Sequence, residues 1–426
     1  MAVDYTRALG PYLWDEQDNQ YLDLNGGYGV FTLGRNHPTL RQRLTDFLAS
    51  EAPSMVKLGV STLAAELGAA LRTQTSLPID TVHFGSTGAE AVEMALSFAQ
   101  LATGREVFVH CDNSYHGLTG SARSVSGDKT FCPNSCATIA QSRRSIPFND
   151  LAALERALAP GDVAAFIVEP IQGKTLNVAD ESYLANAGAL CHRHNALLIV
   201  DEIQSGMGRT GRFLATEWDE NASPDLVTLS KALGGGLVPV SAVLAGPCIR
   251  QRVFQSFERA AAAYSTFSEN ALAMIAALGA LEITREEGLI DKAQRNGRRF
   301  FTLLDQLCQR FPLAGEARGR GLMLGLELDA NIQGKIGATL GKALDPGLFA
   351  QGVLIPLFRD HRILAQVAAP RSKLIKFLPP LDLCSGDFDW VERGLANALG
   401  QASRFPGPLW RSLMTLASSA KGGPAR

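Results

Sequence analysis

The residues of this 426-residue chain best suited to chemistry are a lysine and an aspartate that each follow an apolar run. Lys231 opens a glycine-rich segment directly after the run Leu226–Leu229, and Asp201 ends the run Ala196–Val200. A lysine amine forms a Schiff base with an aldehyde, and a carboxylate keeps a pyridine nitrogen protonated so that the ring takes up electrons. Each residue alone is explained as a surface lysine or a helix-capping aspartate. Together they point to pyridoxal 5'-phosphate (PLP) chemistry.

The segment Phe84–Ala91 joins a predicted strand to a predicted helix through small residues. Free backbone N–H groups at a helix start, together with the hydroxyl of Thr87, form a cradle for phosphate. An ordinary turn followed by a capped helix explains the same residues. The segment is therefore a candidate phosphate site that needs support from elsewhere in the chain.

Three further side chains are candidates for the same site. Tyr115 follows a predicted strand and offers a ring that would stack on a flat cofactor, although core packing is the commoner role of a lone tyrosine. The neighbouring His116 is equally well explained as a hydrogen-bonded structural residue. Thr266 precedes an alanine-rich predicted helix around Ala271–Leu281, where a hydroxyl either caps the helix or binds phosphate. Nothing local decides between these two roles.

The segment Gly206–Gly211 matches the dinucleotide-binding pattern G-x-G-x-x-G and follows a predicted strand. No helix-like stretch opens at these glycines, and no strand ending in an acid follows about 20 residues later, as ribose binding requires. We therefore interpret the segment as a glycine-rich loop beside the active site rather than as an NAD site.

Composition narrows the class of protein. A chain that is 46% hydrophobic and 19% charged builds a large core, and the net charge of -2 implies no nucleic-acid partner. The seven cysteines are odd in number and scattered, which favours reduced thiols in a cytoplasm. Cys132 and Cys136 lack a second ligand pair, so we expect no metal site. No apolar run reaches the roughly 18 residues of a membrane span, and we expect a cytoplasmic protein without membrane contact.

Short apolar runs alternate with helical patterns between residues 81 and 245, which predicts an α/β fold with a large, mostly parallel sheet. Residues 1–40 instead contain a hairpin-like signal, and a second strand-helix lobe begins near residue 290. The predicted organisation has four parts: residues 1–40 in a small lobe, 41–285 in a large domain, 286–402 in a C-terminal small domain, and 403–426 as a loosely ordered tail.

These motifs, in this order, resemble the class III (ω-type) aminotransferases, which are PLP enzymes of fold type I. The resemblance runs from about Gly10 to about Leu399, nearly the whole chain. It is carried by many segments at once: Tyr12–Asp15, Tyr21–Asp23, His37–Pro38, Gly88–Ala91, Tyr115–Gly117, Glu169–Gly173, Asp201–Gly206, Gly208–Gly211, Lys231 with its glycines, and Pro379–Leu381.

The resemblance implies a role for each candidate residue. It makes Lys231 the carrier of the cofactor and Asp201 the partner of the pyridine nitrogen. By the same match Gln204 lies near the ring hydroxyl, Tyr115 and His116 belong to the cofactor site, and Thr87, Gly88 and Ala89 hold the phosphate. Thr266 matches a threonine that completes the phosphate site of the neighbouring subunit, so a homodimer is implied.

Within the family, ornithine δ-aminotransferases resemble much of the chain but differ where they bind substrate. They hold carboxylates with an arginine where this chain has Lys376, gate that arginine with a glutamate where it has Lys174, and place a second arginine where it has Leu118. Arginine grips a carboxylate through a planar fork, which lysine lacks. The segment His361–Val367 looks more like amine- and aldehyde-handling members, such as putrescine-type and prodigiosin-pathway-type enzymes. We name Tyr28, Lys174 and Lys376 as substrate contacts.

The sequence therefore predicts a PLP-dependent aminotransferase that moves an amino group between a primary amine or amino acid and an aldehyde or keto acceptor, in specialised or amine metabolism. Three alternatives remain open. One is an ω-amino-acid aminotransferase of the ornithine or acetylornithine type. Another is a PLP isomerase or racemase, because fold and cofactor do not fix the reaction type. The third is a binding protein on a retired enzyme fold.

Overall fold

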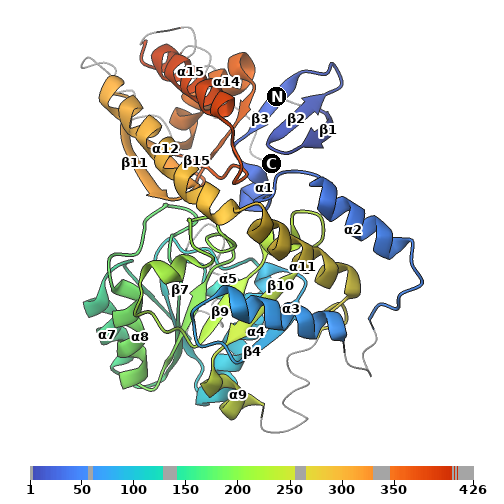
Figure 1. Ribbon diagram of the computed structural model, residues 1–426. Coiled ribbons are helices and arrows are strands. Elements are labelled where there is room, and N and C mark those ends of the chain that lie inside the picture. Colours follow the sequence, from blue (N-terminus) through green and yellow to red (C-terminus); the bar gives the residue numbers. More distant parts are fainter. Residues whose placement is uncertain are drawn as a thin grey trace, which may run out of the picture.

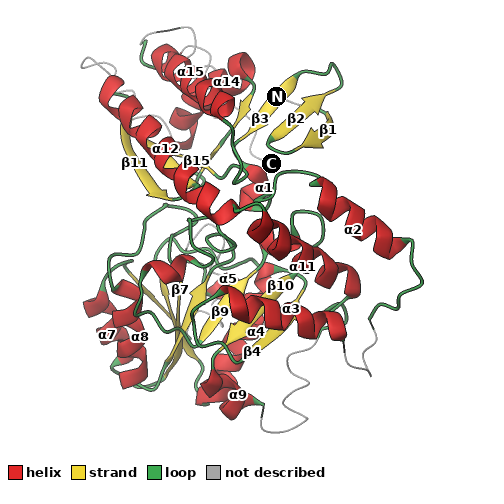
Figure 2. Ribbon diagram, in the orientation of Figure 1, coloured by secondary structure: helices red, strands yellow, loops and turns green. Residues whose placement is uncertain are grey.

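The computed structural model describes residues 3–55, 61–127, 142–254, 265–329, 346–404, 407 and 410. These residues form a larger lobe around a seven-stranded sheet and a smaller lobe around two four-stranded sheets (Figure 1). Figure 2 shows the strands of the large sheet in the lower lobe with helices around them. In the part of the chain that is described, no helix combines the length and apolarity that crossing a membrane requires.

Most strands of the large sheet have their C-terminal ends along one edge. Its strands run parallel except β10, which is antiparallel to both of its neighbours. The other strands therefore all end at the edge where β10 begins. In spatial order they are β4 (Thr81–Gly85), β10 (Ser241–Ala245), β9 (Leu226–Leu229), β8 (Leu197–Asp201), β7 (Val163–Val168), β5 (Val107–Cys111) and β6 (Arg143–Ile146).

Helices bury both faces of this sheet. Successive strand residues point to opposite faces, so Ile199 packs into the apolar cluster that contains α4, whereas Leu198 and Val200 pack into the cluster of α7 and α8. This two-sided burial explains why the strands are apolar throughout rather than alternating. The helices of this lobe are α3 (Thr62–Gln74), α4 (Gly88–Thr103), α5 (Gly120–Ser124), α7 (Leu151–Leu158), α8 (Tyr183–Arg193), α9 (Pro247–Val253) and α11 (Ala271–Glu286), with the short 3₁₀ turns η2 (Ala215–Trp218) and η3 (Lys231–Gly234).

Both ends of the chain build the smaller lobe. One sheet joins N-terminal strands to a C-terminal one, since Leu22 in β3 pairs with Ile363 in β13. Its strands are β1 (Tyr5–Leu9), β2 (Tyr12–Asp15), β3 (Gln20–Asp23) and β13 (Ile363–Leu364). The other sheet holds β11 (Ala314–Arg320), β12 (Met323–Leu328), β15 (Leu374–Phe377) and β14 (Gln366–Val367). The remaining helices are α1 (Gly26–Gly29), α2 (Pro38–Leu48), α12 (Leu289–Arg310), α14 (Pro346–His361) and α15 (Ser385–Ala402).

The structure confirms the expected fold class, a large mostly parallel sheet with a smaller lobe from both chain ends. The hairpin signal corresponds to β2 and β3, and the long helix near residue 290 to α12. Gly206–Gly211 forms turns rather than a helix start. The polar edge strand β6 escaped prediction because Arg143 and Arg144 break its apolar pattern.

The proposed domain limits stay a prediction. Cys132, Cys136 and residues 411–426 lie outside the described residues. Near the C-terminus, the buried ring of Trp410 packs on Phe349 and donates a hydrogen bond to the carbonyl of Ala402.

Candidate active site

A cavity of about 920 Å³ lies outside the edge at which the parallel strands end. Open α/β sheets bind ligands at this edge because the loops that leave the strands converge there. The ends of five parallel strands contribute: Thr87, Gly88 and Ala89 follow β4, Tyr115 and His116 follow β5, Glu169 follows β7, Asp201 and Gln204 mark the end of β8, and Lys231 follows β9.

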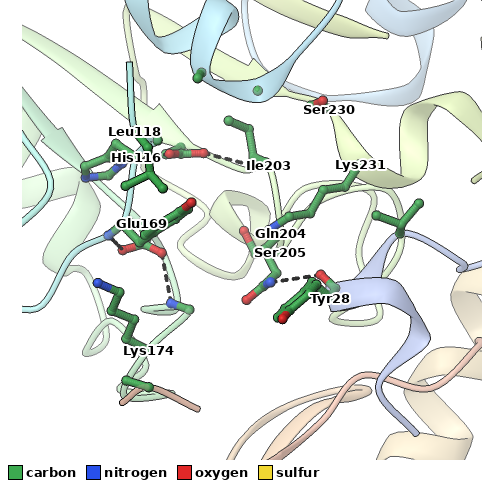
Figure 3. A pocket seen from close by; sticks show the side chains of 18 of the residues that line it. Tyr28, His116, Leu118, Glu169, Lys174, Ile203, Gln204, Ser205, Ser230 and Lys231 are labelled. Atoms are coloured by element: carbon green, nitrogen blue, oxygen red, sulfur yellow. Dashed lines mark hydrogen bonds and ion pairs between the residues drawn. The ribbon is translucent and has the colours of Figure 1, made fainter. Parts of the chain in front are cut away.

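Lys231 reaches into this cavity from the first turn after β9 (Figure 3). Its backbone is left-handed, with φ of 42°, a strained conformation for a residue that carries a Cβ atom. The hydroxyl of the preceding Ser230 donates to the carbonyl of Val240 and ties the turn to β10. Burial lowers the pKa of the Lys231 amine to about 8, although Asp201 and Glu169 act in the opposite direction. An amine so placed is readily available as a neutral nucleophile.

Asp201 is held as a fixed buried carboxylate. Its Oδ1 accepts from the backbone N–H of Ile203 at 3.0 Å and from the hydroxyl of Thr228 at 3.1 Å. Its Oδ2 lies 2.7 Å from Nδ1 of His116. His116 is itself buried, and its Nε2 has no partner among the described residues. The contacts fix the orientation of the acid, as expected for a group that must face a ligand.

The start of α4 borders the same cavity. Thr87 is extended and caps the helix by accepting from the N–H of Glu90 at 3.2 Å, while the Glu90 carboxylate accepts from the N–H of Ser86. A helix start leaves N–H groups without intrahelical acceptors and favours anions. A Cβ atom on Gly88 would lie 3.0 Å from Ile203, so glycine keeps this turn close to the loop after β8.

Glu169 positions two loops of the cavity. Its carboxylate accepts from the N–H of Tyr115 at 3.1 Å and from the N–H of Gly173 at 2.8 Å. Burial raises the pKa of this carboxyl, while the nearby His116 counteracts it. The sequence marked Glu169 only as part of a motif and gave it no role in the site.

Gln204 links three distant segments. Its amide donates to the carbonyl of Tyr28 at 2.9 Å, and its oxygen lies 3.4 Å from Nζ of Lys376. Tyr28 belongs to the N-terminal turn α1, and Lys376 lies in β15 of the smaller lobe. The cavity therefore closes only when the N-terminal turn, the large lobe and the smaller lobe come together.

The substrate end of the cavity combines two lysines, Lys174 and Lys376, with an apolar wall. Lys376 is buried and donates to the carbonyl of Gly173 at 2.6 Å, and it forms no ion pair within the described residues. Burial lowers the pKa of its amine to about 7, with Lys231 and Lys174 acting in the same direction. Nζ of Lys174 lies 5.1 Å from the centre of the Tyr115 ring. The nearby wall is apolar: Leu118, Ile171, Val367 and Ala368.

All the residues predicted for the site line this cavity except Thr266, which is exposed elsewhere on its own chain. Their individual roles remain predictions. Thr228 is a contact that sequence reasoning missed, because it lies inside an apolar strand and only the pairing of β8 with β9 sets it beside Asp201.

The residues present fit a bound PLP. The cavity offers an amine for the aldehyde of PLP and a fixed carboxylate for its pyridine nitrogen. It also offers an aromatic ring that would stack on the flat cofactor ring and a capped helix start for the phosphate. Nε2 of His116, buried beside Asp201, has no hydrogen-bond partner among the described residues and can still bond to a polar group. Metal ligands are not gathered here: no group of three or more His, Cys, Asp or Glu suited to a metal occurs among the described residues.

Comparison with known proteins agrees with this geometry. The family model "Aminotransferase class-III" matches residues 1–399. The aminotransferase PigE of a Serratia species is 31% identical over 94% of this chain, which spans 51% of that longer protein. The ornithine aminotransferase of Brevibacillus brevis is 31% identical over 92% of both chains. The crystal structure of an ornithine aminotransferase from Toxoplasma gondii is 30% identical, covers 94% of this chain and 90% of its own, and superposes with a TM-score of 0.82. The chain thus belongs to the class III aminotransferases, the PLP-dependent transaminases of fold type I.

Proposed function

We propose that Lys231 anchors PLP covalently and that Asp201 faces its pyridine nitrogen. Thr87, Gly88 and Ala89 would hold the phosphate, Tyr115 would cover the ring face, and Gln204 would lie near the ring hydroxyl. The observation that carries this assignment is the convergence of these residues, from four strand ends, on one cavity.

When bound, PLP supplies an aldehyde for the substrate amine and a ring that takes up electrons. The chain supplies the rest. With PLP bound, the amine of Lys231 would serve as the base that takes a proton from the substrate carbon bearing the amino group, and as the acid that gives a proton back during the transfer. Its pKa of about 8 in this pocket suits an amine that must both take and give a proton near neutral pH. Contacts with Ile203, Thr228 and His116 hold the Asp201 carboxylate in place.

The covalent assignment is tested by reducing the holoenzyme with borohydride and mapping the labelled peptide. We expect the label on Lys231, and Lys231→Ala should abolish turnover while leaving PLP bound without a covalent link. Lys292→Ala is the matched control, since that amine pairs with Asp382 outside the cavity. Label on any other lysine would refute the assignment.

The substrate that fits best is a primary amine or a medium- to long-chain aldehyde without a carboxylate near Leu118. The apolar wall favours hydrocarbon. Lys174 and Lys376 stand where ornithine δ-aminotransferases have a glutamate and an arginine, and burial lowers the pKa of Lys376 to about 7. Ornithine would place its carboxylate where Leu118 offers only hydrocarbon, and neither lysine has the planar fork with which arginine grips a carboxylate. Comparing kcat/KM for ornithine, putrescine and a medium-chain aldehyde is the test. We expect the best of these to exceed ornithine at least tenfold, about 1.4 kcal/mol of transition-state binding.

A preference for ornithine would instead support the second candidate, an ω-amino-acid aminotransferase. Two observations favour it: the similarity to ornithine and acetylornithine aminotransferases, and the ability of a protonated Lys376 to pair with a carboxylate. Acetylornithine should be included in the panel, because its blocked α-amine removes the second positive charge. Activity in a single-substrate assay without an acceptor carbonyl would point to an isomerase.

We also propose a homodimer with shared active sites. Thr266 is exposed and absent from the cavity of its own chain, and the neighbouring Phe267 ring is 61% exposed. A two-fold arrangement would bring each Thr266 to the phosphate end of the partner's cavity. The family uses amine and keto substrates, and the partners of this chain are accordingly a second copy of itself and two small molecules.

A further inference from the structure

A second cavity, of about 270 Å³, lies behind the active site where the two lobes meet. Large-lobe residues after β7, at the start of α8 and in η2 form most of it, and Arg320 at the end of β11 contributes from the smaller lobe. Ile171 lines both cavities, so a single side chain separates them at that point.

Charges of both signs face this cavity without neutralising one another. The Arg320 guanidinium is half-buried, and burial lowers its pKa. Within the described residues it has no carboxylate within ion-pair distance. Asp180 and Glu181 are exposed at the mouth, and their carboxylates have no hydrogen-bond or ion-pair partner in the described part of the chain. A third acid of the lining, Asp219, accepts from the N–H of Ala185 at 2.9 Å. A half-buried cation without a counter-charge is costly, and a ligand anion would relieve that cost.

The ring of Trp218 forms part of the cavity wall beside Arg320. Its indole Nε1 is buried and has no hydrogen-bond partner among the described residues. The guanidinium carbon of Arg320 lies 4.8 Å from the centre of the indole ring, and that of Arg212 lies 5.0 Å from it. Of these two arginines only Arg320 lines the cavity, where it is the charged donor beside the indole ring. Pro170, Val178 and Leu184 supply apolar surface beside it.

We propose that this cavity binds a small amino acid as a zwitterion, at a site distinct from the active site. The carboxylate would accept from Arg320, the ammonium would face the acidic residues Asp180, Glu181 and Asp219, and a short side chain would lie on the apolar wall. Such a ligand carries a positive and a negative group, as the lining does, and is small enough for the volume of about 270 Å³.

An occupant of this site would act on the active site through a short connection. Ile171 forms an isolated β-bridge with Val178, and the carbonyl of Gly173, two residues further on, accepts from Lys376. The ligand would also join the lobes, because its carboxylate partner comes from β11 and its ammonium partners from the large lobe. Binding is therefore expected to alter KM for the substrate more than kcat.

The test is equilibrium dialysis of the holoenzyme with radiolabelled α-aminoisobutyrate, which has no α-hydrogen and is not transaminated. Arg320→Gln is expected to weaken binding about tenfold or more by removing a charged hydrogen bond. Arg212→Gln is the matched control: this arginine also lies against Trp218 but is outside the cavity, so binding should be unchanged. Borohydride reduction of the cofactor link before dialysis removes the aldehyde that could capture the amine of the ligand in the larger cavity, and it should likewise leave binding unchanged.

Asp180→Asn, at an exposed position, provides a second variant if Arg320→Gln does not fold, and it should also weaken binding. Acetate and ethylammonium, which each carry half of the zwitterion, should bind more weakly than α-aminoisobutyrate. Binding that is absent, that survives Arg320→Gln and Asp180→Asn, or that is lost after borohydride reduction would overturn the proposal. Acetate binding as tightly as the amino acid would also overturn it, because the site would then recognise an anion alone.

Discussion

At the scale of single residues, the effect of the negative charge of Asp201 can be tested separately from the effect of its position. Asp201→Asn keeps an oxygen that accepts from Ile203 and Thr228, and it removes the negative charge together with the oxygen that faces Nδ1 of His116. Without that charge the pKa of a facing pyridine nitrogen falls, so the ring takes up electrons less well. We expect PLP to remain bound and kcat to fall about hundredfold or more. Cofactor content by absorbance and steady-state kinetics measure the two effects. Near-normal turnover would contradict the assigned role, and Thr228→Val, which loosens the acid but keeps its charge, should cost less.

Lys376 makes a prediction about stability and pH. Its amine has a folded-state pKa of about 7, below its ordinary value of 10.5. Between these two values the unfolded chain binds one more proton than the folded chain, so stability rises with pH across this window. The destabilising effect is complete below pH 7 and vanishes above the unfolded pKa. Lys376→Met should therefore stabilise the protein most below pH 7, with a gain that shrinks toward pH 10. Urea unfolding across this range measures it, and a gain independent of pH would show that the amine is not responsible.

At the scale of elements, the N-terminal turn α1 is placed by backbone contact. Gly26 has φ of +53°, and a Cβ atom there would lie 2.2 Å from the carbonyl oxygen of Leu378. Gly10 has nearly the same φ, +56°, with no atom within 4 Å of the added carbon. Gly10→Ala should thus cost about 1–2 kcal/mol of left-handed strain. Gly26→Ala adds a clash with fixed backbone and should cost about 3–5 kcal/mol.

Displacement of this turn has a functional consequence, because Tyr28 and its bond from Gln204 move with it. Chemical denaturation of the two variants compares the costs, and substrate KM reports on Tyr28. Equal destabilisation by the two alanines would mean that α1 is not packed against Leu378 as the structure has it.

At the scale of the whole molecule, hybrid dimers of two different variants test whether each active site is shared between the two subunits. Lys231→Ala and Thr266→Ala subunits are each expected to be inactive or weak as homodimers, because every site carries a defect. In a hybrid, one site combines both defects and the other has neither. Mixing by denaturation and refolding should thus restore up to about a quarter of wild-type activity for random 1:2:1 pairing. Activity that never exceeds the two parents would count against the shared site.

The sequence by itself determined the chemistry and the layout of the large lobe. Lys231 and Asp201 were recognisable because each follows an apolar strand, and strands in a parallel sheet deliver their C-terminal residues to one edge. The alternation of strand and helix from β4 to β10 is local in the chain, so its periodicity could be read directly. The start of α4 was visible for the same reason, since Thr87 and Glu90 cap it within one turn.

Contacts between distant segments were decided only by the tertiary structure. Thr228 lies in an apolar run, and nothing in its neighbours indicates that its hydroxyl reaches Asp201. The same holds for Glu169, whose partners are a loop after β5 and its own loop, and for Gln204, which joins Tyr28 to Lys376 across the molecule. Burial, too, is a property of the assembled lobes. The sequence showed that lysines replace the carboxylate anchors, but only packing removes Lys376 from water and lowers the pKa of its amine.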